Sequence, residues 1–267
     1  MEAAIVRRLI GEAVGTLLLV LFGAGSVVAA LTVSGGKPID YPSLGMISLT
    51  FGLVIALVIY AFGTLSGAHI NPVVTVGLAS VGRFPWVEVI PYIIAQAVGA
   101  FGGGLLIMAA FGTRAADFGT GGTKLSPDVS WAQGITAEAI GTFLLVLAIM
   151  ALAVDRRAPS GWAGLMIGLA VTTGILMVGP VTGGSFNPAR TFGPYLATAV
   201  FGGSVTWADF PVYLIGPLIG SIVAVAAYEL VARPERPLAA VEGTQGVVRG
   251  RKVPVPGEAQ RPHPSRG

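Results

Sequence analysis

The sequence has no cysteine and little charge. Of its 267 residues, none is Cys and only 11% are Asp, Glu, Lys or Arg, whereas a typical soluble domain carries about 25% charged residues. The absence of cysteine excludes a disulfide, a thiolate metal site and a cysteine nucleophile. Hydrophobic residues make up 54% of the chain and the mean hydropathy is +0.80. This composition indicates a membrane protein.

Six apolar runs are long enough to cross a bilayer, which requires about 20 residues. An even number of spans puts both termini on the same side of the membrane. The first run follows Arg7 and Arg8, as in a secretory signal, but it is longer than the apolar region of a signal and contains Glu12, so we do not expect cleavage. The expected spans are residues 6–32, 44–64, 87–111, 134–154, 162–178 and 210–231, separated by segments rich in turn-forming residues.

The distribution of Lys and Arg predicts the orientation in the membrane. Cytoplasmic loops carry an excess of these residues, so we expect the arginine-rich side to be cytoplasmic and the protein to be a multi-pass protein of the plasma (cell inner) membrane, with both termini cytoplasmic. That side holds Arg7, Arg8, Arg83, Arg156, Arg157 and the arginines from Arg233 onward. The opposite side holds Lys37, Arg114, Lys124, Asp40, Asp117 and Asp128.

The C-terminal segment differs from the rest of the chain. Residues 233–267 combine frequent proline with scattered arginine, and such a composition cannot bury enough apolar surface to fold. We therefore expect a disordered, basic, proline-rich cytoplasmic tail, distinct from a membrane domain at residues 1–232.

Two short stretches are almost alike. They are Ser66-Gly67-Ala68-His69-Ile70-Asn71-Pro72-Val73 and Thr182-Gly183-Gly184-Ser185-Phe186-Asn187-Pro188-Ala189-Arg190. Asn is a favoured N-cap, and Pro is tolerated at the first helical position because its missing N–H would be unpaired there. Each stretch is therefore predicted to lead from irregular backbone into a helix, at residues 72–81 and 188–200. Both helices are too short to span a bilayer.

The two halves of the chain repeat each other. Residues 12–21 match residues 138–147, the Asn-Pro stretches match, and Tyr92-Ile93-Ile94 matches Tyr213-Leu214-Ile215. The repeats cover about residues 4–112 and 131–232, and each contains three spans and one short helix. An odd number of spans makes the second repeat inverted in the membrane. We therefore expect the two Asn-Pro stretches to enter from opposite faces and to meet at the midplane.

These stretches have the chemistry of a passage for neutral solutes. Irregular backbone at membrane depth survives where it lines a water-filled cavity or is buried in protein. The positive ends of two helices, together with Arg190, oppose the entry of protons and other cations. Asn71 and Asn187 can each offer a side-chain N–H to a solute. The candidate pore-lining acceptors are the carbonyls of Gly67, Ala68, His69, Gly183, Gly184 and Ser185.

The two motifs, at this separation, resemble those of the aquaporin (major intrinsic protein) family over about residues 4–232. The resemblance implies an all-α membrane fold of six transmembrane helices and two re-entrant half-helices, assembled in the lipid bilayer as a homotetramer with one pore per subunit. It implies a passive channel for water and small uncharged solutes, not an enzyme, with no cofactor, metal or nucleic acid. The constriction motifs are Asn71-Pro72-Val73, where the family usually has Ala in place of Val73, and Asn187-Pro188-Ala189.

The same resemblance assigns an outer selectivity filter by spacing from the two asparagines. Its four positions are Phe51, Ile175, Gly184 and Arg190. Water-specific members tend to have His where Ile175 stands, and glycerol facilitators usually have Asp where Thr191 stands. This filter is therefore of neither type and is most similar to the nodulin-like plant branch and its prokaryotic relatives. Some of those proteins pass glycerol, boric acid or arsenous acid.

Glu12 and Glu138 lie inside the first and fourth spans and permit two interpretations. They could relay protons, or they could accept hydrogen bonds from the Asn-Pro loops and brace them, and both the repeat and the family resemblance favour bracing.

Two other functions remain as alternatives to a channel. A secondary transporter uses inverted repeats as well but needs a coupling-ion site, for which only these glutamates are available; a structural membrane protein would have a closed pore.

Overall fold

The computed structural model describes residues 2–232, which form helices without a β-strand in that range. Within it, six helical segments are long and apolar enough to cross a membrane, as the sequence predicts. They are Ala4–Val33, Tyr41–Ser66, Trp86–Phe111, Trp131–Val154, Ala163–Thr182 and Trp207–Val231. The tail expected at residues 233–267 lies outside the described residues.

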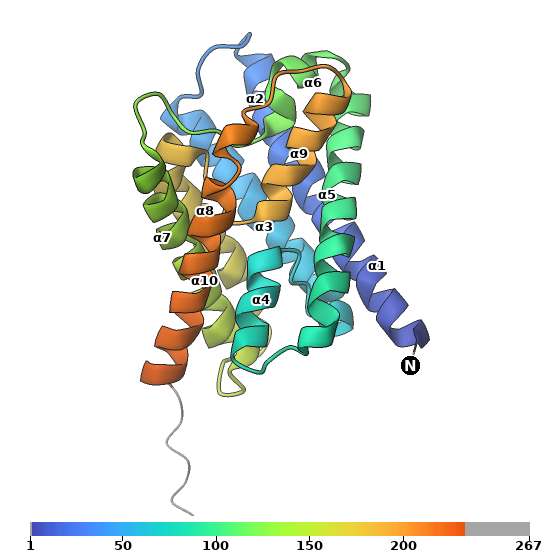
Figure 1. The fold of residues 1–267 in the computed structure, drawn as a ribbon, viewed down its shortest axis with the longest axis vertical. Coiled ribbons are helices and arrows are strands. Elements are labelled where there is room, and N and C mark those ends of the chain that lie inside the picture. The colour runs from blue at the N-terminus through green and yellow to red at the C-terminus, as the bar shows by residue number, and fades with distance from the viewer. Residues whose placement is uncertain (1, 233–267) are drawn as a thin grey trace, which may run out of the picture. The chain divides into compact units, whose positions relative to one another are not determined.

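The six spans surround two short helices, α4 (Pro72–Ser80) and α9 (Pro188–Val200). In Figure 1, α4 lies in the lower half of the bundle and α9 in the upper half, as expected of an inverted repeat. The spans are built from α1 (Glu2–Leu18), η1 (Leu19–Ala24) and α2 (Gly25–Val33), then α3 (Tyr41–Ser66), α5 (Val89–Phe111), α7 (Trp131–Ile149), α8 (Ala163–Thr182) and α10 (Val212–Val231).

The short helices begin at the Asn-Pro pairs for the reason that the sequence suggests. Asn71 and Asn187 have extended backbone, and each side-chain oxygen accepts a hydrogen bond from an N–H in the first turn of its helix. The long helices before them, α3 and α8, are capped at their C-termini by Gly67 and Gly183. Both glycines have left-handed backbone, with φ of 89° and 83°, which glycine adopts without a steric penalty.

The bundle is tightly packed where glycines face the backbone of another helix. A Cβ added to Gly99 of α5 would lie 2.0 Å from the carbonyl oxygen of Ala13 in α1. The equivalent pair in the second repeat is Gly220 of α10 and Ala139 of α7, at 2.2 Å. Small residues permit this close approach of helices in membranes. The two repeats therefore use the same crossing to bring their first and third spans together.

Two segments differ from the sequence expectation. The first span is not a continuous α-helix, because its middle, η1, is π-helical. The segment at residues 113–130, expected to be simple turns, contains α6 (Arg114–Asp117) and the 3₁₀ helix η3 (Gly119–Gly121). Gly119 and Gly121 have φ of 61° and 70°, and this left-handed backbone folds the segment back onto the bundle, where Thr120 is fully buried.

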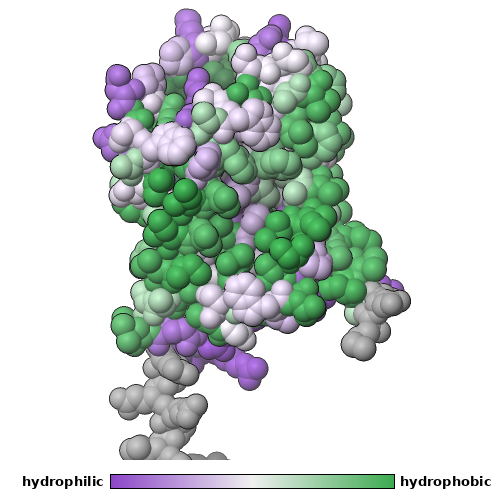
Figure 2. Space-filling view, viewed as in Figure 1, coloured by the Kyte–Doolittle hydropathy of each residue, from purple (hydrophilic) through white to green (hydrophobic). Residues whose placement is uncertain are grey.

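The outer surface is that of a protein embedded in lipid. Figure 2 shows a broad hydrophobic belt across the middle of the face in view, with hydrophilic residues gathered at the top and at the lower end. Large apolar side chains on the spanning helices are well exposed, such as Leu57 in α3 and Met177 in α8. A belt of this kind is stable in the hydrocarbon core of a bilayer, so the chain is a multi-pass membrane protein.

Candidate functional site

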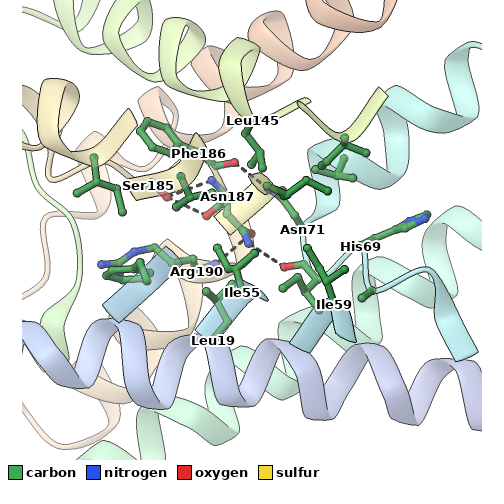
Figure 3. Close-up of a pocket in the computed structure, with 18 residues that line it drawn as sticks. Leu19, Ile55, Ile59, His69, Asn71, Leu145, Ser185, Phe186, Asn187 and Arg190 are labelled. Carbon is green, nitrogen blue, oxygen red and sulfur yellow. Dashed lines mark hydrogen bonds between the residues drawn. The ribbon is translucent and has the colours of Figure 1, made fainter. Parts of the chain in front are cut away.

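The two Asn-Pro loops meet inside the bundle through a reciprocal pair of hydrogen bonds (Figure 3). Asn71 Nδ2 donates to the carbonyl oxygen of Phe186 at 2.8 Å, and Asn187 Nδ2 donates to that of Ile70 at 2.7 Å. Each amide nitrogen carries two hydrogens, and the bond between the loops occupies one of them. The other is therefore available to a solute beside the asparagines.

The residues before the asparagines have unusual backbone. Ile70 and Phe186 have φ of 44° and 56°, a left-handed conformation that is rare for bulky side chains. This conformation is associated with presenting their carbonyls to the opposite loop. Sequence analysis did not single out these two carbonyls, although both residues occupy the same place in the repeat, directly before Asn.

A narrow cavity of about 40 Å³ adjoins both asparagines, and a vestibule of about 1020 Å³ lies at one end of the bundle. Arg190 lines both spaces and therefore stands where the vestibule meets the cavity. Polar groups on the cavity wall come from the two loops and from Arg190 in the first turn of α9, whereas the spanning helices supply apolar side chains. The latter are Leu19, Phe51, Ile55, Ile59, Leu145, Ile149, Ile167, Val171 and Ile175.

Three of the four predicted filter residues line the cavity, namely Phe51, Ile175 and Arg190. Gly184 is not among the lining residues. A Cβ added to it would lie 3.2 Å from Ile175 Cγ1, and its φ is 63°. Gly184 therefore allows the loop to lie directly against Ile175, and a side chain there would be strained as well as crowded.

Arg190 is 2% exposed and is held by two contacts. Its Nη1 donates to the carbonyl oxygen of Gly121 at 3.0 Å, and its guanidinium lies 4.7 Å from the ring centroid of Phe51. Its Nε has no hydrogen-bond partner within residues 2–232. A buried N–H without a partner is costly, so this group is suited to bind a solute oxygen. Sequence analysis did not single out Gly121. The feature that could have indicated it is the group of three glycines within residues 119–122.

The predicted carbonyl acceptors divide into three groups. Ala68, His69 and Ser185 belong to residues that line the cavity, whereas Gly183 lines the vestibule and Gly67 lines neither space. The imidazole of His69 packs against the rings of Phe84 and Tyr92. In Figure 3 the His69 ring points away from the asparagines.

The remaining motif residues are buried between the helices. Pro72, Val73, Pro188 and Ala189 are all buried, and the carbonyl of Val73 accepts a hydrogen bond from Ser221 Oγ of α10 at 2.7 Å. The first loop therefore accommodates Val in place of the usual Ala within the packed interior.

The two intramembrane glutamates, both fully buried, bind the Asn-Pro loops in the same way. Glu12 accepts hydrogen bonds from the backbone N–H groups of His69 and Ile70, at 2.9 and 2.7 Å. Glu138 accepts them from Ser185 and Phe186, also at 2.9 and 2.7 Å. The last residue of the preceding helix donates a further bond to each carboxylate, from Ser66 Oγ to Glu12 and from Thr182 Oγ1 to Glu138.

The repeated tyrosines also hold the loops. Tyr92 donates its hydroxyl hydrogen to the carbonyl of Ser66 at 2.9 Å, and Tyr213 donates to that of Thr182 at 2.8 Å. The repeats differ at one contact, because Gln96 Nε2 donates to Glu12 at 2.9 Å and Pro217, which occupies the matching place in α10, cannot do so.

Comparisons with known proteins agree with this architecture. A family model described as major intrinsic protein matches residues 1–228. Aquaporin AqpM of Methanothermobacter marburgensis is 45% identical, over 85% of this chain and 97% of that protein. Aquaporin NIP1-1 of Zea mays is 35% identical, over 87% of this chain and 77% of that protein. The X-ray structure of the aquaglyceroporin from Plasmodium falciparum has a TM-score of 0.76 at 28% identity, covering 86% of this chain and 98% of that one.

The contacts of Glu138 allow a test that distinguishes its two interpretations, a brace for the loop and a proton relay. Glu138→Gln replaces one acceptor oxygen by an NH₂ group that faces donors, so we expect a loss of roughly 2 kcal/mol of stability. The melting temperature in detergent and the water permeability of proteoliposomes should both fall. Thr136→Ala, on the exposed side of the same helix, is the control. An unchanged melting temperature, together with loss of a proton flux present in the wild type, would favour the relay.

Proposed function

The chain belongs to the major intrinsic protein family and forms a passive membrane channel for water and small solutes; we propose that it passes neutral molecules up to the size of glycerol and excludes ions and protons. Residues 1–232 would form the channel domain, with repeats at about 4–112 and 131–232. The observation that carries the proposal is the narrow cavity shared by Asn71, Asn187 and Arg190.

The proposed pore would have one polar side and one apolar side. Asn71 and Asn187 would each donate their second amide hydrogen to a solute, and the carbonyls of Gly67, Ala68, His69, Gly183 and Ser185 would accept hydrogen bonds along its length. A solute that binds along this path regains part of the roughly 4–8 kcal/mol that an unmade hydrogen bond costs in hydrocarbon. The apolar side would accommodate the carbon face of glycerol.

Exclusion of cations would depend on charge. Both short helices begin at the asparagines, so their positive ends face the cavity, and Arg190 adds a full charge at the vestibule. A cation in this passage would lose hydration without gaining a counter-charge. Glu12 and Glu138 would serve as braces, because their oxygens are occupied by loop donors.

The outer filter supports a broad range of neutral solutes. Ile175 offers an apolar wall, and Gly184 brings no side chain. The relative named NIP1-1 and the structure titled aquaglyceroporin are consistent with a filter that admits glycerol, and boric and arsenous acid are further candidates of similar size.

Assembly and orientation follow as further proposals. We propose a homotetramer in the plasma membrane with the N-terminal end of the bundle cytoplasmic. Arg8 and Arg83 lie at this end, where they pair with Glu88 and Glu229. Chemical cross-linking of the protein in native membranes tests the tetramer, and labelling of cysteines introduced at residues 37 and 157 tests the orientation.

The function is tested by stopped-flow light scattering of proteoliposomes. Vesicles are challenged in turn with an impermeant osmolyte, glycerol, urea and boric acid, and protein-free vesicles are the control. We expect water and glycerol permeabilities above the control that do not saturate and need no ion gradient. Saturation together with dependence on a proton or sodium gradient would indicate a secondary transporter, and permeabilities equal to the control would indicate a structural protein.

The filter assignment predicts the effect of Ile175→His. The imidazole adds a polar group to the apolar wall, so glycerol permeability should fall relative to water permeability by roughly tenfold. Ile175→Leu keeps an apolar side chain and is the control. Equal losses of both permeabilities would count against a filter at this position.

The charge assignment predicts the effect of Arg190→Val. Removal of the guanidinium should let protons or alkali cations enter, which a pH-sensitive dye inside liposomes and the conductance of planar bilayers would detect. Arg190→Lys retains the charge and should keep the cation barrier. No change in current or pH equilibration in the valine variant would refute this role.

A further inference from the structure

The π-helical segment η1 of the first span lies directly against Phe51. A Cβ added to Gly23 would lie 2.3, 2.5 and 2.8 Å from three atoms of the Phe51 ring, and real side chains essentially never approach so closely. The ring therefore occupies the volume that any other residue at position 23 would fill. Phe51 lines the cavity whereas Gly23 does not, so the ring separates this backbone from the passage.

The same segment also supports the arginine of the filter. A Cβ added to Gly121 would lie 2.1 Å from the carbonyl oxygen of Ala24, and the carbonyl of Gly121 accepts the hydrogen bond from Arg190. Arg190 in turn lies over the Phe51 ring. Two walls of the proposed constriction, an aromatic ring and a guanidinium, therefore both rest on consecutive residues of η1.

π-Helical turns within α-helices are rare and occur frequently at functional sites. Here the turn carries Leu19 at its start, which lines the cavity itself, and Gly23 and Ala24 at its end. The segment thus lines the passage through Leu19. It also supports two other lining residues, Phe51 through Gly23 and Arg190 through Ala24 and Gly121.

From these contacts we propose that Gly23 is a specificity-determining positioning residue, which sets the width of the outer constriction by letting the Phe51 ring rest against the first span. The inference rests on the proposed function, because it concerns which solutes pass. It adds a residue outside the four filter positions, on a helix that supplies none of them.

A methyl group at position 23 has a defined effect on this arrangement. The ring must move by several tenths of an ångström or more to relieve its overlap with the methyl group. The backbone of η1 blocks movement towards the first span. The ring lines the cavity and lies against Arg190, so displacement away from η1 carries it towards one or the other. The passage should narrow in either case, and glycerol should be affected more than water because it is larger.

The test is Gly23→Ala in proteoliposomes, with water and glycerol permeabilities measured in the same preparation. We expect the glycerol-to-water permeability ratio to fall by roughly tenfold. Gly25→Ala is the matched control: it lies two residues further along the span, and its Cβ would meet Ile107 Cγ1 at an ordinary 3.6 Å. This control should leave the ratio unchanged. Where the wild type conducts water but not glycerol, the water permeability itself should fall.

A second variant separates positioning from a general loss of structure. If Gly23 acts through the ring, Gly23→Ala should have little effect in a Phe51→Leu background, since the smaller side chain leaves room for the methyl group. An unchanged ratio in Gly23→Ala, or an equal fall in both backgrounds, would overturn the proposal.

Failure of the proposed function gives a different result. If wild-type vesicles have the same water permeability as protein-free vesicles, the channel proposal and this inference both fail. If wild-type vesicles conduct and Gly23→Ala retains the wild-type ratio, only the positioning role is wrong.

Discussion

The reciprocal hydrogen bonds between the two Asn-Pro loops are the interaction on which the rest of the structure depends. Each asparagine uses its side-chain oxygen to cap its own helix and its side-chain nitrogen to bind a carbonyl of the other loop. Two segments of irregular backbone can therefore lie at membrane depth with these polar groups paired. A single substitution at Asn71 or Asn187 would remove a cap and a link together.

The loops are supported from outside the interface by buried carboxylates, and this support accounts for two otherwise costly charges. An isolated buried carboxylate is strongly destabilising unless donors surround it. Glu12 and Glu138 each accept two consecutive backbone N–H groups and one hydroxyl. The same loops need these acceptors, because their left-handed residues leave N–H groups outside any helix. The buried carboxylates and the irregular backbone of the loops thus stabilise each other. This mutual support explains both glutamates without a role in proton transfer.

Local sequence patterns predicted most of the fold. The six spans, the two short helices and their Asn caps depend on composition and on neighbouring residues, so the sequence was sufficient for them. The contact of Gly121 with Arg190 and the hydrogen bonds accepted by the carbonyls of Ile70 and Phe186 join residues far apart in the chain. The glycines at 119–122 and the shared position before each Asn mark these residues in the sequence, but neither pattern says which group they bind, because the partner is set when separate segments pack together.

The inverted repeat also accounts for a proposed filter whose charge lies at one end of the cavity only. Each proposed filter position has a counterpart at the same spacing from the other asparagine: Ile167 for Phe51, Ile59 for Ile175, Ala68 for Gly184 and Val74 for Arg190. All four counterparts line the same cavity, yet none of them has a polar side chain. Duplication thus places a second set of four residues around the same cavity, and of the two sets only the proposed filter carries a charge, at Arg190. In the proposed channel, a neutral solute would pass the charge of Arg190 once and would otherwise meet apolar side chains. Ions would then face an electrostatic barrier at that point, while the solute would not be bound at two successive sites.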